Sequence, residues 1–516
     1  MTSNGSSIKK EPHADVLYAE LIGPKRQKLQ ALQQSFHNFS FTRVPRQPDF
    51  EFLPVDHTHL AKQEEYELFP YFPDIFQEHI IGIQSLHDSL VTHPDKARLT
   101  QIITRFYDGT YDHYAFTDQK NQIWVKMDGV VYHDARDWTI AEGKRGSLKK
   151  ALQHLYLWQW RGLDRWCVVY DEHLMTSGSS GIRIMQTMFP KFHNHAILIP
   201  RVSRKASGKS SVLMTNTLAY SHAVEGGSGI GDYVLPQYTH PQLNRSADWT
   251  QPQQPCISNI SQSLVAYLQT YYKYPINSQA KDPVKNSTRI TNITSEKGYI
   301  NEHKKHHKNS LSDRIFDYLY GILWTPAFAE EYQPFLKKGF PHIPFPTNWK
   351  WFEKIAIIGH KLGELHCFEK KPEGPKFPHP GISLSKVEKQ YYIRNPCYDA
   401  DQHKIIFDTH KGEESFWVGQ ISQAMWDFEI GGYPQLAQWL KNRRYRPLES
   451  DSGFHTKRYQ FTRHLTCAEL QIFVQLCQII NQTLVLRSHL NQIYHQFSVG
   501  TEAWIDFHDF PTRKNR

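Results

Sequence analysis

A proline-bearing stretch between two helical patterns is the feature that most limits how this chain folds. The segment 317–368 reads DYLYGILWTPAFAEEYQPFLKKGFPHIPFPTNWKWFEKIAIIGHKLGELHCF. Apolar side chains recur at helical spacing over 318–323 and again over 352–365. Between them, residues 340–346 carry prolines, which donate no hydrogen bond and push the preceding residue towards an extended backbone. We predict two amphipathic helices joined by an extended link, with Pro326 ending the first helix or starting a further one.

The composition sets broad limits. The 516 residues are enough for about two to four domains. Lys plus Arg number 60 against 51 Asp plus Glu, and the net charge of +9 favours a polyanionic partner, although it also suits ordinary solubility. The six cysteines form no CxxC pair and fit a reduced cytosol. Without a secretory signal or a long apolar run, we expect a cytoplasmic protein with no membrane partner.

Strand-like runs dominate the first half and helical patterns the second half. The expected strands are 16–21, 123–127, 130–132, 166–170, 196–202, 211–218 and 233–238. Helical spacing marks 99–106 and a long terminal helix around 470–484. We predict a mixed α/β (α+β) fold, with a strand-rich domain followed by a mostly helical C-terminal domain. The expected boundaries are a polar tail at 1–13, the strand-rich domain at 14–274, a flexible insertion at 275–310, the helical domain at 311–498 and a tail at 499–516.

Several stretches resemble one known family, both in their residues and in their order along the chain. They are VLYAELIGPKRQKLQAL from residue 16, DIFQEHIIGIQSLHD at 74–88, WRGLDRWCVVY at 160–170, AILIPR at 196–201, VLMTNTLA at 212–219, YVLPQYTHP at 233–241, the segment 317–368, and WDFEIGGYPQLAQWLKNRRYR at 426–446. Together they resemble the C-terminal specificity (target-recognition) region of type ISP restriction-modification enzymes and related type IIG adenine-specific DNA methyltransferases. Two places depart from the family: His87 stands where an arginine is usual, and Gly162-Leu163 replaces proline-phenylalanine.

The resemblance implies a DNA target-recognition domain that binds duplex DNA and has no catalytic centre of its own. The first strand resembles the end of a methyltransferase domain, so we expect the C-terminal half of a split or truncated enzyme. No cofactor is then expected in this chain, and S-adenosylmethionine would bind a partner or a missing N-terminal half. The expected partners are double-stranded DNA and a methyltransferase polypeptide, with a helicase or nuclease polypeptide as a further candidate. The chain has no GxxxxGK[ST] phosphate loop for a motor of its own.

Two basic stretches are the candidate DNA-binding surface. Residues 201–209 carry four cations and no acid between two expected strands, and these are Arg201, Arg204, Lys205 and Lys209. Residues 142–150 add Lys144, Arg145, Lys149 and Lys150. Solvated turns are the structural alternative for both. Arg165 and Arg183 either lie near this surface or anchor a domain contact. Residues 442–446 either contact the DNA backbone or place cations at a helix C-terminus.

An adenine methyltransferase is the first alternative. Asn395–Tyr398 reads NPCY, one residue from the tetrad that binds a flipped adenine, and Gly227–Asp232 has the spacing of a nucleotide-binding loop. However, the glycines precede a strand-like run at 233–236, whereas a cofactor loop should join a strand to a helix. An Asx-Pro turn and a flexible loop are the structural alternatives.

Signals for a nuclease or a metal site are weaker. Asp137 followed by Glu142–Lys144 distantly resembles a metal-binding nuclease set. The histidines of 193–195 and of 303–307 lack matching ligand spacing, and a solvated loop is the alternative for the second group. A remnant or assembly scaffold that does not bind DNA is the remaining hypothesis.

Overall fold

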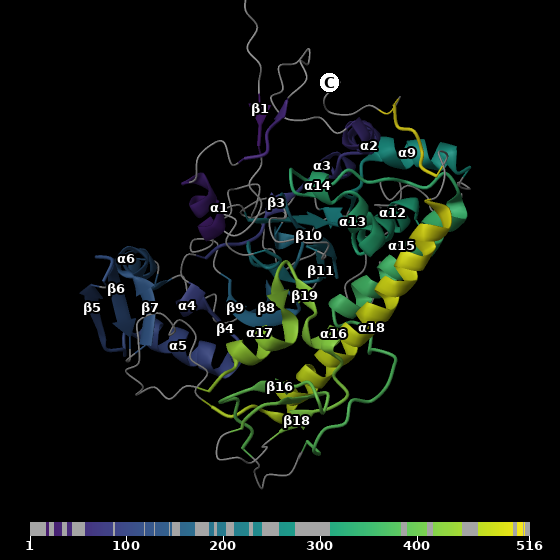
Figure 1. Cartoon of the computed structure of the whole chain (residues 1–516). Coiled ribbons are helices and arrows are strands. Elements are labelled where there is room, and N and C mark those ends of the chain that lie inside the picture. Colours follow the sequence, from purple (N-terminus) through teal and green to yellow (C-terminus); the bar gives the residue numbers. More distant parts are fainter. Residues whose placement is uncertain are drawn as a thin grey trace, which may run out of the picture. The chain divides into compact units, whose positions relative to one another are not determined.

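The structure is a computed structural model of the 516-residue chain (Figure 1). It describes residues 17–19, 25–33, 39–43, 57–85, 88–117, 119–127, 130–143, 145–146, 155–170, 185–189, 193–202, 211–225, 231–239, 257–273, 310–382, 390–409, 416–445, 463–498, 503–508 and 510. The chain divides into two units, Met1–Leu68 and Phe69–Arg516. The smaller unit contains β1 (Leu17–Tyr18), α1 (Lys25–Leu32), β2 (Thr42–Arg43) and α2 (His57–Leu68). In it, β1 pairs antiparallel with β2, so the expected first strand is present but short.

The first sheet of the larger unit has four antiparallel strands in the order β11-β10-β13-β3. They are β3 (Ile80–Ile81), β10 (Ala196–Pro200), β11 (Leu213–Thr215) and β13 (Asp232–Pro236). Every residue of β10 is buried, as suits a central strand that is covered on both faces. The strand expected at 196–202 is confirmed over 196–200, and the one expected at 233–238 is confirmed over 233–236, while Tyr238 pairs with Ser258 in another sheet. The one expected at 211–218 is divided, because Leu218 belongs to another sheet.

The second sheet has the order β12-β8-β9-β4. Its strands are β4 (Thr92–His93), β8 (Leu155–Arg161), β9 (Asp164–Val169) and β12 (Leu218–Ala219). Stacked rings fill its core, with Trp160 lying 4.6 Å from Trp166 and 4.4 Å from Tyr220 between ring centroids. Ile83 joins the two sheets, because its amide donates to the Ala219 carbonyl at 2.8 Å and its carbonyl accepts from the Ser221 amide at 2.8 Å.

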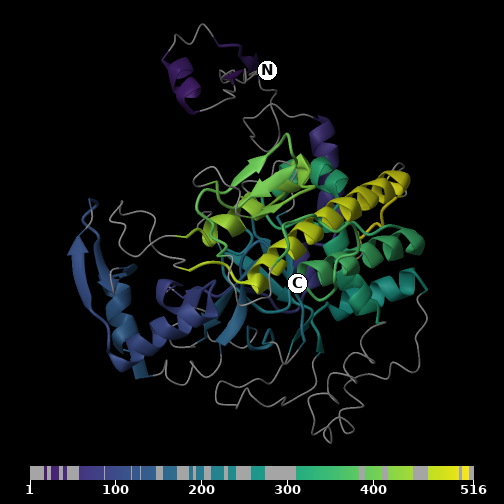
Figure 2. The same cartoon turned by 90° about the horizontal axis from the view of Figure 1, so that it is seen from below.

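The third sheet is the meander β5-β6-β7. Its strands are β5 (His113–Thr117), β6 (Ile123–Met127) and β7 (Val130–Asp134). The β6–β7 pairing is antiparallel and confirms the expected hairpin, while the Asp128-Gly129 turn lies outside the described residues. Helices α5 (Lys96–Asp108) and α6 (Ala135–Gly143) lie beside this sheet in both views (Figures 1 and 2).

Helices of very different length form the core of the second half. They are α12 (Leu311–Leu323), α13 (Pro326–Glu331), α14 (Gln333–Leu336), α15 (Trp349–His366) and α18 (Cys467–Phe497), and Figure 1 shows α18 running beside α15. Pro326 starts α13, which settles the alternative left open for it. Helices α12 and α15 approach closely at two glycines. A Cβ on Gly359 would collide with the Asp317 carbonyl, and one on Gly321 would lie 2.6 Å from the Ile355 carbonyl.

The predicted extended link is confirmed, and it forms backbone hydrogen bonds with segments from both ends of the larger unit. The Phe72 amide donates to the Pro341 carbonyl, and the Ile343 amide donates to the Pro70 carbonyl, each at 2.9 Å. On the other side, the Ile505 amide donates to the Phe345 carbonyl at 2.8 Å. The prolines of the link therefore do not prevent it from pairing, because the neighbouring residues supply the donors.

Short elements complete the larger unit. They are α3 (Phe72–Ile75), α4 (Asp88–Val91), β14 (Tyr238–Thr239), β15 (Ile257–Ser258), α9 (Gln262–Tyr271), β16 (Cys397–Asp399), β17 (Lys404–Ile406), β18 (Trp417–Val418), α16 (Gln423–Trp426), β19 (Glu429–Ile430), β20 (Tyr433–Pro434) and α17 (Gln435–Asn442).

The mixed α/β class with a helical C-terminal region is confirmed. The insertion expected at 275–310 lies almost entirely outside the described residues, and the domain boundaries stay predictions. Within the described part of the chain, no helix is long and apolar enough to cross a membrane.

Candidate nucleic-acid interface

Arg201 stands at one end of the first sheet, where β10 ends and β13 begins. We call this end, at which Pro200 is in register with Asp232, the Arg201 edge. Strands β10 and β11 are antiparallel neighbours, so the basic stretch 201–209 connects two paired strands, as expected. The Arg201 side chain is exposed, whereas Arg204, Lys205 and Lys209 lie outside the described residues.

Aromatic side chains surround the Arg201 edge. Tyr233 and Tyr71 contact the same ring, Phe340 of the extended link, at centroid distances of 4.8 Å and 6.2 Å. The His342 ring lies 5.1 Å from Tyr71. Partial burial raises the pKa of the Tyr71 hydroxyl, and the positive charge of Arg201 opposes that shift, which places the guanidinium within electrostatic range of the ring. A cation and half-buried rings therefore occur together here, a combination that suits contact with nucleic acid.

The glycine-rich stretch begins and ends at the same edge. The Asp232 carboxylate accepts hydrogen bonds from the Val224 amide at 2.6 Å and the Glu225 amide at 3.2 Å, which holds the two ends of the stretch together. Burial raises the pKa of Asp232 well above its ordinary value. Residues 226–230 lie outside the described residues, but the strand that follows them is β13, as the sequence predicted. The glycine-rich stretch therefore leads into a strand and not into a helix. Its two ends lie at the Arg201 edge, as the start of the basic stretch does.

The second basic stretch follows α6, beside the third sheet. Arg145 is exposed, and Lys144, Lys149 and Lys150 lie outside the described residues. Tyr111 donates a hydrogen bond to the Glu142 carboxylate at 2.6 Å. Burial and this bond raise the pKa of Tyr111 to about 12, while the nearby Arg145 acts in the opposite direction. The Arg145 side chain therefore lies close to Tyr111, beside the third sheet, whereas Arg201 lies at the end of the first sheet.

Arg165 anchors a contact between the two halves of the larger unit. Its side chain is half-buried and the guanidinium donates to the Asn216 amide oxygen at 2.9 Å and lies 5.0 Å from the Phe368 ring centroid. Burial lowers the pKa of Arg165. Of the two interpretations offered for Arg165, the structure favours the domain contact; Arg183 lies outside the described residues.

Two of the stretches that resemble the family, 160–170 and 426–446, contact each other. The turn after β8 presents the Leu163 amide to the Gln435 side chain at 2.7 Å, and the Arg161 guanidinium lies 5.4 Å from the Tyr433 ring centroid. Asp164, at the start of β9, forms a buried ion pair with Arg443 at 2.9 Å. The end of α17 therefore holds the β8–β9 hairpin.

The NPCY stretch has structural contacts. The Asn395 side-chain oxygen accepts from Arg444 at 3.1 Å. Tyr398 stacks on Trp426 at 5.1 Å and donates to the Ile421 carbonyl at 2.9 Å. In a methyltransferase, the Asn395 side chain would bind the adenine amine and the Tyr398 ring would stack on the base. Here both side chains contact other residues of the chain instead. These contacts favour the turn interpretation of Asn395–Tyr398.

The histidine candidates also lie among protein contacts. His195 lies 3.0 Å from a Glu369 oxygen, and Glu369 accepts from Asn216 at 2.8 Å. Burial would raise the pKa of Glu369, but its hydrogen bonds to His195 and Asn216 lower that pKa to about 2. No group of three or more metal-ligating side chains occurs in the described part of the chain. Residues 303–307 and the side chain of Asp137 are outside it.

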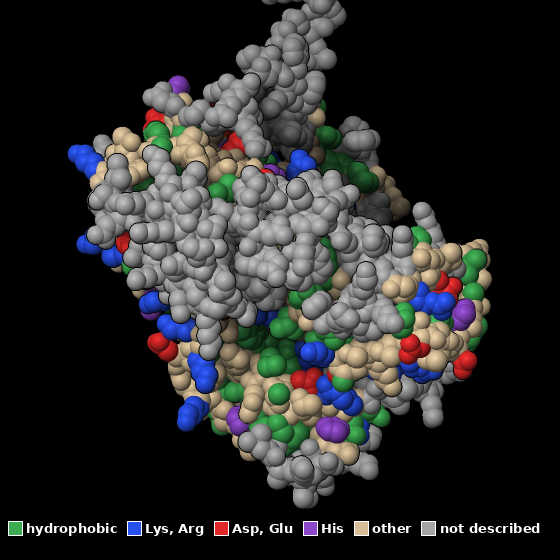
Figure 3. Space-filling view, turned by 180° about the vertical axis from the view of Figure 1, so that it is seen from behind, with side chains coloured by type: hydrophobic (Ala, Val, Ile, Leu, Met, Phe, Trp, Pro, Cys, Tyr) green, Lys and Arg blue, Asp and Glu red, His purple; other side chains and the backbone are tan. Residues whose placement is uncertain are grey.

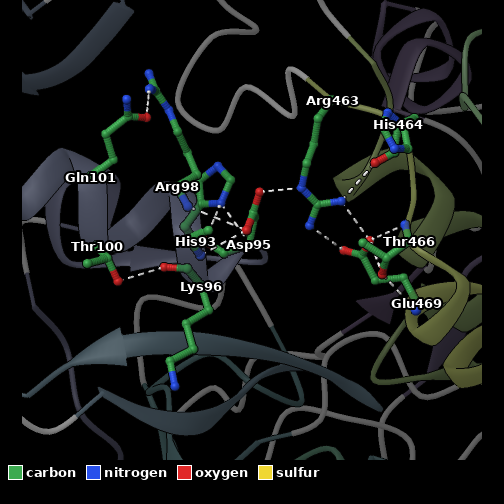
Figure 4. Close-up of polar contacts among 11 residues, drawn as sticks. His93, Asp95, Lys96, Arg98, Thr100, Gln101, Arg463, His464, Thr466 and Glu469 are labelled. Carbon is green, nitrogen blue, oxygen red and sulfur yellow. Dashed lines mark hydrogen bonds and ion pairs between the residues drawn. The ribbon is translucent and has the colours of Figure 1, made fainter. Parts of the chain in front are cut away.

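A surface pocket of about 640 Å³ opens where α5 and α18 begin. Arg463 binds Asp95 at 2.6 Å and Glu469 at 2.8 Å across this pocket (Figure 4). Burial would raise the pKa of Asp95, yet the hydrogen bond and charge of Arg463 outweigh it and lower that pKa. Asp95 and Glu469 also bind backbone amides at the two helix starts. The Arg463 ion pairs therefore tie the starts of the two helices together. Lys96 and Arg463 balance Asp95 and Glu469 in the pocket lining, so the pocket offers no excess of cations for the phosphates of DNA.

The described cations form no single patch on the face drawn in Figure 3, where Lys and Arg side chains are spread among acids and hydrophobic groups. The sequence predicted the Arg201 and Arg145 stretches from charge alone. It missed the rings around Arg201, because Tyr71, Tyr233 and Phe340 come from segments far apart in the chain. The extended link was predicted, but nothing in its local pattern indicates which strands it meets.

Comparison with protein families finds one match that spans most of the chain. The model described as the Type ISP C-terminal specificity domain matches residues 74–470. A search of curated protein sequences finds no match.

Solved structures with a similar fold include two Type ISP restriction-modification enzymes and one further protein–DNA complex. The first is a nuclease-deletion mutant of the Type ISP restriction-modification enzyme LlaGI in complex with a DNA substrate mimic (15% identity, TM-score 0.54, covering 90% of this chain and 31% of that one). The second is the ATP-dependent Type ISP enzyme LlaBIII bound to DNA (14%, 0.53, 87% and 26%). The third is a DrdV–DNA complex (17%, 0.57, 92% and 42%). The chain therefore spans less than half the length of each, and at these identities the likeness shows the fold.

Proposed function

This chain belongs to the family of Type ISP C-terminal specificity domains, and we propose that it recognises a DNA target for a restriction-modification adenine methyltransferase system. The solved relatives are complexes with DNA or a DNA mimic, which supports double-stranded DNA as the ligand. The observation that carries the proposal is the family match over 74–470, which includes both basic stretches and the strands that present them.

The Arg201 edge is the proposed contact surface. Two connections leave the first sheet there, one basic and one rich in glycine, beside an exposed arginine and half-buried rings. Lysines of the basic stretch would supply affinity for phosphates, while arginines can form paired hydrogen bonds with guanine edges. The segment around Arg145 is the second proposed contact.

Catalysis is proposed to reside outside this chain. S-adenosylmethionine would be held by a methyltransferase polypeptide or an N-terminal half, with a helicase or nuclease polypeptide as a further partner. We propose that the protein acts in the cytoplasm, in defence against phage DNA. The contacts made by Asn395 and Tyr398 support this division, because both side chains make hydrogen bonds within the C-terminal half.

The salt dependence of duplex binding tests the Arg201 edge. Log affinity should fall with log salt by about 0.9 for each phosphate neutralised. Neutralising Arg201, Arg204, Lys205 and Lys209 together should lower that slope, because fewer counterions are released. We would measure binding to a labelled random-sequence duplex by anisotropy at several salt concentrations.

A matched variant controls for overall charge. Neutralising Lys361, Lys370, Lys371 and Lys376, which are exposed on the helical half, removes the same charge away from the proposed surface. This variant should keep the wild-type slope. If both variants change the slope equally, or neither does, the Arg201 edge is not the contact surface. A chain that binds no duplex at low salt would favour the scaffold hypothesis.

Calorimetry with S-adenosylmethionine separates the proposal from the methyltransferase alternative. We expect no saturable heat from the isolated chain. Saturable binding that is lost in Asn395→Ala or Tyr398→Ala would assign the chemistry to this chain instead.

A further inference from the structure

Arg161, the last residue of β8, has no partner for its charge within the described part of the chain. Its side chain is half-buried. The Nε atom is buried and has no hydrogen-bond partner among the described residues, and no described carboxylate forms an ion pair with this guanidinium. By contrast, Arg443, which contacts the same hairpin, is paired with Asp164. Keeping a cation partly out of water without an acceptor costs free energy, and a ligand with acceptor atoms would offset that cost.

Aromatic rings hold the Arg161 guanidinium in place. It lies 5.5 Å from the Trp160 ring centroid and 5.4 Å from the Tyr433 ring centroid. The His222 ring is within electrostatic range, because burial and the positive charge of Arg161 lower the pKa of His222, while Asp88 opposes both. The rings of Trp160 and Tyr433 restrict the guanidinium, so less conformational entropy is lost when it binds an anion.

Backbone contacts connect Arg161 with the Arg201 edge. The amide of Gly162, the next residue, donates to the Ala223 carbonyl at 2.6 Å. The following amide, that of Val224, donates to the Asp232 carboxylate at 2.6 Å, and Asp232 starts β13 at the Arg201 edge. Arg161 therefore lies near the surface that we propose for DNA contact, on the side of the second sheet.

The acids of this region do not neutralise Arg161. Glu225 and Asp232 are each 1% exposed, so neither presents its carboxylate at the surface. The half-buried Asp88 accepts a hydrogen bond from the Tyr220 hydroxyl at 3.2 Å and forms no ion pair with Arg161. Among the described residues, the guanidinium thus keeps its charge for a ligand.

We infer that Arg161 binds a phosphate group of the double-stranded DNA that meets the Arg201 edge. The inference rests on the proposed function and adds a contact from the second sheet. An arginine can donate two parallel hydrogen bonds to one phosphate, and it stays charged at any cellular pH. Because the Nε atom is buried, the two terminal nitrogens are the ones that would meet the phosphate.

The salt dependence of duplex binding tests this contact. With the full chain and a labelled random-sequence duplex, Arg161→Gln should lower the slope of log affinity against log salt by about 0.9, because one phosphate contact is lost. Arg161→Lys should keep the wild-type slope, because the positive charge remains, but should bind less tightly, because the paired hydrogen bonds are lost. A purely structural arginine would change stability or affinity and leave the slope as it is.

Arg314 on α12 provides the matched control. It is half-buried like Arg161, but it already lies 3.5 Å from a Glu353 carboxylate oxygen on α15. Arg314→Gln removes the same charge and should leave the slope unchanged. An equal change of slope in both variants would show an effect of net charge and would overturn the inference.

Chemical modification of the wild-type chain covers the case in which Arg161→Gln does not fold. An arginine-specific dicarbonyl reagent should modify Arg161 more slowly when the random-sequence duplex is saturating, as measured by mass spectrometry of the peptides. Arg314 should react equally with and without the duplex. Equal rates at Arg161 in both conditions would overturn the inference, and so would an Arg161 that does not react in the free chain, because a phosphate could not reach it either.

Failure of the inference can be told apart from failure of the proposed function. If Arg161→Gln keeps the wild-type slope while neutralising Arg201, Arg204, Lys205 and Lys209 lowers it, the Arg201 edge binds DNA without Arg161. In that case only the inference is overturned. If the wild-type chain binds no duplex even at low salt, both are overturned.

Discussion

Removing the Arg443 guanidinium should destabilise the protein more than any surface charge change. Arg443 and Asp164 are each nearly buried, with 6% and 5% of their side chains exposed. Two hydrogen bonds join them, at 2.9 Å and 3.2 Å. Trp166 and Asn442 also donate to the Asp164 carboxylate, at 2.9 Å and 2.8 Å. The pair thus ties the β8–β9 hairpin to the end of α17.

The expected cost follows from the charge that is left behind. Arg443→Met keeps most of the side-chain length, but it leaves the Asp164 carboxylate buried with two neutral donors, which costs about 3–5 kcal/mol. It also removes the cation that lies 4.2 Å from the Trp439 ring centroid. The double variant with Asp164→Asn leaves no uncompensated charge. It should cost less than the sum of the single variants by at least about 1 kcal/mol.

Urea denaturation of the four proteins in this cycle provides the measurement. A chain of 516 residues does not have to unfold in one step, so the transition should be followed by fluorescence and circular dichroism together. Arg444→Met is the matched control, because Arg444 is exposed and makes hydrogen bonds to Arg394 and Asn395; it should cost about 1 kcal/mol or less. A loss below about 1 kcal/mol for Arg443→Met, or an additive cycle, would refute the reasoning.

Two further predictions concern a turn and a buried histidine. Gly162 has φ of 52°, and an added Cβ would collide with the Gln435 side chain, so Gly162→Ala should cost more than about 2 kcal/mol in urea unfolding, while Gly381→Ala, with open space around it, should be nearly neutral. Burial lowers the pKa of His366 from 6.5 to about 3. Between these values the unfolded chain binds a proton that the native chain does not, so stability should fall by up to about 1.4 kcal/mol per pH unit below pH 6. His366→Gln should flatten that fall in urea midpoints measured from pH 7 to pH 4; an unchanged slope would show that other groups cause it.

Local patterns predicted the elements well where each one carries its own signal. The apolar spacing of 352–365 lies within α15, and the prolines of 340–346 predicted an extended segment because proline restricts the backbone wherever it occurs. The hairpin at 123–132 follows from alternation around a two-residue turn. Each of these patterns lies within a short stretch of sequence, so it can be recognised without knowing the rest of the fold.

Contacts between distant segments could not be predicted in the same way. Residues 442–446 were interpreted as a cationic helix end or a backbone contact, yet Arg443 is neutralised by Asp164, which lies 279 positions earlier. Gly162 departs from the family pattern, and the side chain packed against it, Gln435, comes from another motif. Neither the Arg443–Asp164 pair nor the Gln435–Gly162 contact can be predicted from one sequence. At such separations, many other pairs of residues have equally complementary charge or size.

The Asp164–Arg443 contact also limits when the protein can complete its fold during synthesis. A ribosome that adds about 5–20 residues per second needs roughly 14–56 seconds to pass from the β8–β9 hairpin to the end of α17. Throughout that interval the stacked tryptophans of the second sheet are present without the helix that ties down their hairpin. A nascent chain stalled before residue 443 should therefore bind chaperones at this hairpin and be cut there by protease, and extending it through α17 should remove both effects.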